Sequence, residues 1–331
     1  MRSFAFTPAE SVGQAVSAQG GDGDAAYIAG GTTLIDLVKL DVMRPARMVG
    51  VNRLPLNDVE RLDDGRLRVG ALVTNTELAH HPLVTAHFPL LSQAILAGAS
   101  TQLRNMATTG GNIMQRTRCP YFRDAAAACN KREPGSGCDA LDGINRMHAI
   151  LGTSEHCIAA HPSDMCVALA ALGATLTLVG PHGAREIAFG DFHRLPEDRP
   201  DREHEIEPGE LITHVTLDSP VEGAGAHYLK LRDRASYEFA LASAGAMIAV
   251  EKGVIREARL ALGGVGTRPW HAQEAEQALR GQPPETVNFE KAAGIALRDA
   301  SARQHNAFKI PLARQAIVRA LEKATQAATD S

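Results

Sequence analysis

Four of the five cysteines in this 331-residue chain lie within one stretch that glycine and proline interrupt repeatedly. The four are Cys119, Cys129, Cys138 and Cys157. Residues that break helices and strands stand between them, namely Pro120, Pro134, Gly135, Gly137 and Gly143. A segment of this kind buries too few apolar side chains to offset the entropy of ordering its backbone. We therefore expect a group held by the four thiolates to order it.

Three kinds of group could engage these cysteines. Disulfides require an oxidising compartment and dominate in small secreted domains rather than in chains of this length. Structural zinc uses thiolates that usually come as C-x2–4-C pairs, and the sequence has no such pair. Iron–sulfur clusters accept wider spacings, such as the gaps of nine, eight and eighteen residues found here. The spacing favours a cluster and leaves zinc, and paired or unligated cysteines, as alternatives.

The fifth cysteine, Cys166, differs because it lies in the apolar, helix-like run SDMCVALAALGA. We predict a small buried hydrophobic residue there rather than a ligand. Around the other four, seven basic residues stand against four acidic ones between Arg104 and Arg146. This charge is expected to lower the pKa of the thiols and to offset an anionic cluster, unless it belongs to a solvated basic loop.

The composition argues against several classes of protein. A net charge of −4 and a single tryptophan, Trp270, do not suit a nucleic-acid partner. No run of about 18 apolar residues occurs, so we expect no membrane span. The N-terminal residues have no apolar stretch of signal-peptide length, and we expect no export signal on this chain itself. The length suits two or three domains.

Two Thr- and Gly-rich turns give the best evidence for a ligand. Residues 26–40 predict a short strand (Ala26–Ala29), a Gly-Gly turn and a helix with apolar residues at helical spacing. Residues 106–116 contain a second Gly-Gly pair, flanked by threonines and an asparagine. Each turn offers hydroxyls and bare N–H groups, which favours phosphate, although many such turns have no ligand. Two of them in one chain favour a dinucleotide.

A polar, proline-marked connection over residues 181–220 precedes a predicted domain boundary. We divide the chain into residues 1–60, 61–219 and 220–331. Before the connection, Ser163 or Asp164 begins a predicted helix, either as its N-cap or as a partner for a cofactor hydroxyl. No G-x-G-x-x-G, HExxH or G-x-S-x-G pattern is present, so neither NAD nor a catalytic residue is predicted.

Five motifs, spread in order over essentially the whole chain, resemble those of a known family. They are IAGGTTLIDLVK, TTGGNI, HPSDM, PGELIT and LKLRDRASYEFALASAGA. The family is that of the FAD-binding (medium) subunits of xanthine dehydrogenase and other molybdenum hydroxylases. The resemblance implies an α+β fold of the CO dehydrogenase flavoprotein type, with two α/β subdomains followed by a C-terminal α+β domain.

The cysteine-bearing insert, at about residues 115–160, is absent from most of that family. Its details RCPYF, NKR and PGSGC are similar to the periplasmic aldehyde oxidoreductase form, in which four cysteines bind a [4Fe-4S] cluster. The resemblance therefore implies that the four cysteines of the insert are ligands of such a cluster. A flavin-subunit cluster also occurs in the related 4-hydroxybenzoyl-CoA reductase branch.

The same resemblance implies a set of FAD contacts. Around the pyrophosphate it places Ala26, Tyr27, Ile28, Ala29, Gly30, Gly31, Thr32, Thr33 and Leu34. The second wall, next to the flavin and the phosphates, comprises Thr108, Thr109, Gly110, Gly111 and Asn112. Ser163 and Asp164 would hold the ribityl or adenosine side, and Leu211 and Lys230 would contact the flavin. The hydrophobic or aromatic residue that the family often has before the second turn is not obvious here.

The implied function is electron transfer within a heterotrimer. A large partner subunit with a molybdenum cofactor would oxidise an aldehyde to a carboxylic acid, with water as the oxygen source. Electrons would pass through [2Fe-2S] clusters on a small subunit to FAD on this chain, and then to an external acceptor. The chain is thus expected to be an oxidoreductase subunit with neither a nucleic-acid nor a membrane partner.

Other functions remain open at this point. The chain could be the flavin subunit of a xanthine dehydrogenase or hydroxybenzoyl-CoA reductase type, a self-sufficient flavin oxidase, or a zinc-stapled scaffold without enzyme activity. The compartment is open too. It would be the periplasm if a partner's twin-arginine signal carried the folded complex, and the cytoplasm otherwise.

Overall fold

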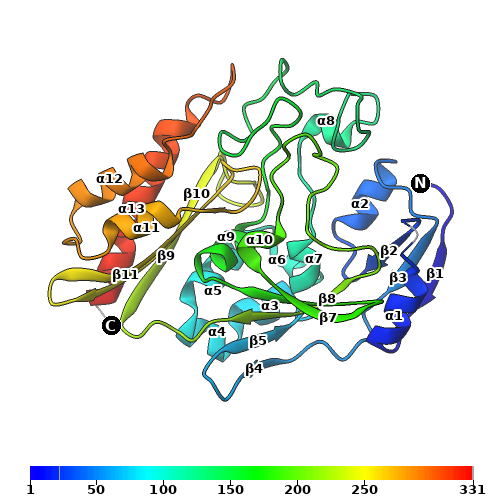
Figure 1. The fold of residues 1–331 in the computed structure, drawn as a ribbon, viewed down its shortest axis with the longest axis horizontal. Coiled ribbons are helices and arrows are strands. Elements are labelled where there is room, and N and C mark those ends of the chain that lie inside the picture. The colour runs from blue at the N-terminus through cyan, green and yellow to red at the C-terminus, as the bar shows by residue number, and fades with distance from the viewer. Residues whose placement is uncertain (22, 330–331) are drawn as a thin grey trace.

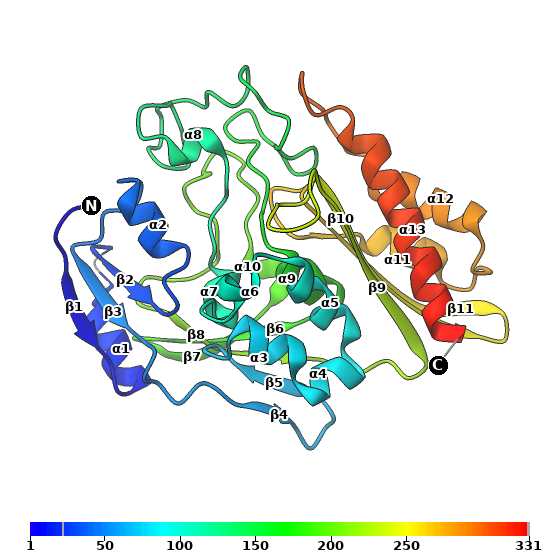
Figure 2. The same ribbon diagram turned by 180° about the vertical axis from the view of Figure 1, so that it is seen from behind.

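In a computed structural model, residues 1–21 and 23–329 are described (Figure 1). The chain forms three sheets that follow one another along the sequence, with strand orders β1-β3-β2, β4-β5-β8-β6-β7 and β12-β11-β10-β9. Figures 1 and 2 show the first sheet at one end of the molecule and the last at the other. None of the helices in these ranges is long and apolar enough to span a bilayer. The domain boundaries at residues 60 and 219 stay predictions.

The N-terminal sheet is parallel. Its strands are β1 (Ala5–Pro8), β2 (Ala25–Ile28) and β3 (Arg47–Gly50), with β3 in the middle. Parallel neighbours need crossover connections, and these contain α1 (Val12–Gln19) and α2 (Leu34–Lys39). Ser11 begins α1, because its side chain accepts a hydrogen bond from the Gln14 N–H. The strand–turn–helix order predicted for residues 26–40 is present, with the strand one residue earlier.

The middle sheet is antiparallel throughout. Its strands are β4 (Val59–Arg61), β5 (Leu67–Gly70), β6 (Thr175–Gly180), β7 (Gly183–Ala188) and β8 (Leu211–Leu217). Short helices accompany it: α3 (Asn75–His80), α4 (Pro82–His87), α5 (Pro89–Ala97), α6 (Thr101–Arg104), α7 (Thr109–Ile113), α9 (Asp164–Ala171) and α10 (Phe189–Phe192). They cover one face of the sheet (Figure 2), and the core between includes Leu176 of β6, Leu91 of α5 and Val167 of α9.

The C-terminal sheet contributes to two cores. Its antiparallel strands are β9 (Ala224–Leu231), β10 (Ala242–Glu251), β11 (Val254–Gly263) and β12 (Trp270–His271). The helices α11 (Gln273–Leu279), α12 (Thr286–Ala296) and α13 (Lys309–Thr329) cover one face (Figure 1). Ala244 and Ile248 of β10 pack with these helices, whereas Met247 belongs to the core of the middle sheet. Because side chains alternate across a strand, β10 joins the two parts of the molecule.

The cysteine-bearing insert is mostly irregular, with one short helix, α8 (Pro120–Arg123), above α2 in Figure 1. The structure corrects the expectation that this segment has too little to bury. Phe122 is fully buried, in a cluster with Leu37 of α2 and Cys129. The Asn130 N–H also donates to the Gly137 carbonyl at 2.7 Å. Protein packing therefore supplies part of the order that we had assigned to a bound group alone.

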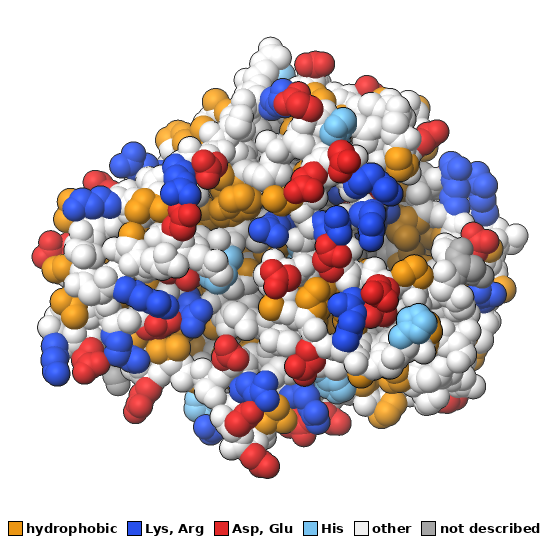
Figure 3. Space-filling view, viewed as in Figure 1, with side chains coloured by type: hydrophobic (Ala, Val, Ile, Leu, Met, Phe, Trp, Pro, Cys, Tyr) orange, Lys and Arg blue, Asp and Glu red, His pale blue; other side chains and the backbone are white. Residues whose placement is uncertain are grey.

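Charged side chains of both signs are interspersed on the face shown in Figure 3. This mixture is in keeping with the small net charge of −4.

Candidate functional site

The structure brings the two predicted glycine turns together. Gly30 lies so near the segment before Thr108 that a Cβ on it would stand 1.8 Å from the carbonyl oxygen of Met106. Only glycine allows such an approach. The next residue, Gly31, has φ +71°, a conformation that glycine adopts without strain. Two segments far apart in the sequence therefore share one surface.

The two turns differ in their free donors. Among the described residues, the backbone N–H groups of residues 30–33 have no hydrogen-bond partner. In the second turn the Thr109 N–H donates to the Val73 carbonyl, and the N–H groups of Gly110 and Gly111 are also occupied. The first turn can thus receive an anion through its backbone, whereas the second is a rigid wall beside it.

Ser163 joins the second turn to α9. Its hydroxyl donates to Asn112 Oδ1 at 2.6 Å and accepts from the Cys166 N–H at 3.1 Å. Ser163 is therefore the N-cap of α9, one of the two roles that the sequence left open. Cys166 is fully buried in the same helix, as predicted.

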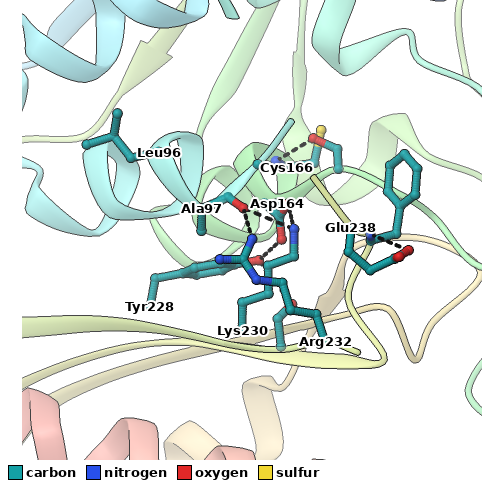
Figure 4. Close-up of polar contacts among 12 residues, drawn as sticks. Leu96, Ala97, Asp164, Cys166, Tyr228, Lys230, Arg232 and Glu238 are labelled. Carbon is teal, nitrogen blue, oxygen red and sulfur yellow. Dashed lines mark hydrogen bonds and ion pairs between the residues drawn. The ribbon is translucent and has the colours of Figure 1, made fainter. Parts of the chain in front are cut away.

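Asp164, the first residue of α9, forms a buried hydrogen-bond network with side chains of β9 (Figure 4). Its Oδ1 accepts from the Tyr228 hydroxyl at 2.6 Å, and its Oδ2 accepts from Lys230 Nζ at 2.8 Å. Lys230 and Arg232 also donate to the carbonyl of Ala97 at the end of α5, each at 3.1 Å. Burial, and then the charge of Asp164, raise the pKa of Tyr228 well above its ordinary value, so the hydroxyl stays a donor.

A cleft of about 180 Å³ lies between the insert, the start of α9 and the ends of β10 and β11. We call it the cofactor cleft. Ser163 and Asp164 line it, together with Cys119, His148 and Phe239. Arg118, also in its wall, donates to Thr33 Oγ1 at 3.3 Å and so connects the first glycine turn to the cleft.

Among the predicted FAD contacts, only Ser163 and Asp164 line this cleft. Residues 26–34 and 108–112 lie outside its wall, and so do Lys230 and Leu211. Lys230 reaches it only through Asp164. Leu211 is buried in the core of the N-terminal sheet, near Tyr27, whose hydroxyl donates to the Gly209 carbonyl at 2.8 Å. Their contact with a flavin stays a prediction.

The four cysteines of the insert line one small cavity, which we call the thiol cavity. None of them forms a disulfide. Cys129 and Cys138 face one another in an isolated antiparallel bridge. Backbone N–H groups point at the sulfurs, those of Phe122 and Tyr121 at Cys119 among them. The fold therefore assembles the four thiols that the sequence singled out.

The pKa values of Cys119, Cys138 and Cys157 shift in the direction opposite to our expectation. Burial raises the pKa of Cys119 to about 12, and it also raises the pKa of Cys138 and Cys157. The charge of Lys131 lowers the pKa of Cys157, but burial outweighs it. The expectation that basic residues lower these pKa values was wrong, because desolvation dominates at all three thiols and a nearby cation opposes it only at Cys157. Without a cation inside the thiol cavity, burial therefore holds the pKa of Cys119, Cys138 and Cys157 above its ordinary value.

No sequence pattern pointed to His148, whose Nε2 lies 3.1 Å from Cys119 Sγ. The sequence analysis also did not single out His161, Cys166 and His193 as a group. Their ligand atoms lie within 4.8 Å of one another. This is the one such group of three or more His, Cys, Asp or Glu residues in the described ranges. His193 is buried with both ring nitrogens unpaired, and burial lowers its pKa well below the ordinary value. These contacts depend on the fold, because their members come from different segments.

The family now follows from comparison with known proteins. Residues 2–220 match the model of the FAD binding domain in molybdopterin dehydrogenase, and residues 227–324 match that of the CO dehydrogenase flavoprotein C-terminal domain. The chain belongs to this family of FAD-binding subunits of molybdenum hydroxylases. The expectations of an FAD-binding oxidoreductase subunit and of a CO dehydrogenase flavoprotein-like fold are confirmed.

Individual relatives are similar over nearly the full length. The aldehyde oxidoreductase FAD-binding subunit PaoB of Escherichia coli is 45% identical, covering 98% of this chain and 99% of its own. The glyceraldehyde dehydrogenase medium chain of Sulfolobus acidocaldarius is 28% identical, over 84% of this chain and 82% of its own. Carbon monoxide dehydrogenase of Hydrogenophaga pseudoflava superimposes with a TM-score of 0.77 at 24% identity, covering 98% of both chains, which shows the fold alone.

Proposed function

We propose that this chain is the electron-transfer subunit of a molybdenum-dependent aldehyde oxidoreductase and carries both FAD and a [4Fe-4S] cluster. The observation that carries the proposal is the pair of adjoining spaces, the thiol cavity and the cofactor cleft, in a chain 45% identical to an aldehyde oxidoreductase FAD-binding subunit. Its partners would be a large subunit with the molybdenum cofactor and a small subunit with [2Fe-2S] clusters.

FAD would bind along the surface that the two glycine turns share. The free N–H groups of residues 30–33 would donate to the pyrophosphate, against the wall formed by residues 108–112. Ser163 and Asp164 would receive the ribityl side at the cofactor cleft. The chain's contribution is to position the cofactor, exclude water from it and surround it with fixed hydrogen bonds. The flavin supplies the change from one-electron to two-electron chemistry when it is bound.

The thiol cavity fits a cluster better than a zinc ion. A tetrahedral Zn–S distance of about 2.3 Å brings all four sulfurs within about 3.8 Å of one another. Among the described residues, the group whose ligand atoms lie close enough together to hold a single ion is a different one, His161, Cys166 and His193. Backbone N–H donors to Cys119, Cys138 and Cys157 would help to set the reduction potential of such a cluster. The cysteines would hold the cluster as thiolates.

Iron, sulfide and flavin analysis of the purified protein, with its visible spectrum, tests this proposal. We expect stoichiometric FAD and four irons with four sulfides per chain. A colourless protein with one zinc would support the scaffold alternative instead. Reduction of the flavin in the isolated chain by aldehyde would support a self-sufficient oxidase, whereas reduction only in the complex supports the proposal. If the complex oxidised xanthine or reduced a hydroxybenzoyl-CoA faster than it oxidised aldehydes, the chain would belong to one of the other molybdenum hydroxylase types.

Two serine variants test the ligand set. Cys129→Ser removes a thiol from the thiol cavity, and we expect it to lose iron and much of the soluble protein. Cys166→Ser changes the cysteine that lies outside the thiol cavity, and it should keep both. Equal iron in the two variants would refute the assignment of the ligands.

A further inference from the structure

Cys119 occupies a position that the other three thiols of the insert do not share. All four line the thiol cavity, and Cys119 alone among them also lines the cofactor cleft. Its sulfur therefore stands in the wall between the two spaces.

His148 lies in the same wall. Its Nε2 is 3.1 Å from Cys119 Sγ, and its ring lines the cofactor cleft although only 2% of the residue is exposed to solvent. The ring of Tyr121 packs beside it, with 6.2 Å between centroids. In the described part of the chain, His148 Nδ1 has no hydrogen-bond partner.

One arrangement of protons suits both side chains when Cys119 is an iron ligand. A ligating cysteine is a thiolate and has no proton to donate. His148 must then donate its Nε2–H to the sulfur, which leaves Nδ1 as an unprotonated acceptor. A buried acceptor without a partner is tolerated better than a buried N–H donor without one. In this tautomer Nε2 is the donor in the 3.1 Å contact with Cys119 Sγ.

We propose that His148 is a positioning residue for the cluster. It holds the sulfur of the ligand that faces the cofactor cleft, and by donating a hydrogen bond to that sulfur it raises the reduction potential of the cluster relative to the flavin. The physical reason is that a hydrogen bond to a ligand sulfur withdraws electron density from the cluster and favours its reduced form. This inference rests on the proposed function.

Three variants of the complete complex test it. His148→Leu removes the donor at similar volume. His148→Gln places an amide N–H near the position of Nε2, and is the conservative rescue. Met147→Leu is the matched control, because Met147 lines the same cleft but makes no hydrogen bond to Cys119. The reduction potential of the cluster is measured by redox titration followed by electron paramagnetic resonance, with iron and FAD content determined on the same samples.

We expect a shift to lower potential in His148→Leu at full iron and FAD content, a return toward the wild-type value in His148→Gln, and no shift in Met147→Leu. Loss of iron from His148→Leu that His148→Gln restores would also support the positioning role. An unchanged potential in an iron-loaded His148→Leu complex would overturn the inference and leave the proposed function intact. Loss of iron in both histidine variants would overturn it too, because cluster binding would then depend on the shape of the histidine ring and not on a hydrogen-bond donor at that position. An iron-free wild-type complex would instead refute the proposed function.

Discussion

Lys131, two residues after Cys129, binds Glu203 with 3.0 Å between Nζ and Oε1, and Arg116 reaches the other carboxylate oxygen at 2.5 Å. Burial alone would raise the pKa of Glu203, but Lys131 and Arg116 hold it well below the ordinary value. This ion triad ties the segment between β7 and β8 to the cysteine-bearing insert.

Glu203→Gln should loosen the insert. It leaves the two cations without their anion in a site where the three side chains are 11–21% exposed, and we expect a loss of about 3 kcal/mol in the free energy of unfolding. Iron should also leave faster in the presence of a chelator.

Because the folded-state pKa of Glu203 is depressed, the stabilisation by the ion triad is present above pH 4.5 and is lost as the pH falls. Asp201→Asn, in the exposed pair with Arg199, should change stability by less than about 0.5 kcal/mol, and equal effects of the two variants would contradict the role of the triad.

Asp164→Asn tests the buried network at the start of α9. The amide can still accept hydrogen bonds, but Lys230, whose side chain is 4% exposed, loses its counter-charge. Breaking a buried pair from one side costs about 3–5 kcal/mol, and we expect a loss of that order by thermal or urea unfolding. The double variant with Lys230→Met should recover part of it, because no charge is then stranded. A double variant less stable than Asp164→Asn would argue against this account.

Gly30→Ala tests the contact between the two glycine turns. The added Cβ would meet the Met106 carbonyl at 1.8 Å, so one turn must move. We expect a destabilisation of about 1–3 kcal/mol and a lower FAD content, measured by flavin absorbance per chain. Gly294→Ala in α12 is the control, since nothing lies within 4 Å of its added Cβ. It should stabilise the chain by about 0.5–1 kcal/mol and leave FAD unchanged. Full FAD content in Gly30→Ala would refute the tight contact.

Lys309 should make stability depend on pH above neutrality. Burial, and then the charge of Arg146, lower its pKa from 10.5 to about 7. The unfolded chain therefore binds one proton more than the folded chain between these values, so the free energy of unfolding rises with pH across that range. Lys309→Met should flatten this rise in unfolding curves recorded from pH 7 to pH 9.5. Lys291→Met, at an exposed position of α12, should keep it, and parallel curves for all three proteins would exclude Lys309 as the cause.

Local sequence patterns predicted part of the fold. The strand, glycine turn and helix of residues 26–40 form as predicted, because apolar spacing and the permissive backbone of glycine act over a few residues. The N-cap at Ser163 is equally local, since its hydroxyl bonds to an N–H three residues on. The thiol pKa values could not be predicted, because the number of basic residues nearby says nothing of how deeply the sulfurs are buried.

Sequence alone determined the strand, turn and helix of residues 26–40, the second glycine turn and the four cysteines, because each depends on a residue's own chemistry and its nearest neighbours. It did not indicate β7 and α10, which lie within the connection predicted over residues 181–220. Tertiary structure decided which of them meet. Asp164 and Lys230 lie on different elements, and Gly30 contacts Met106 only after both sheets have packed. The same holds for Cys119, which the folded insert places between two cavities with His148 against its sulfur. Such contacts arise from the simultaneous burial of distant apolar segments, which no local pattern encodes.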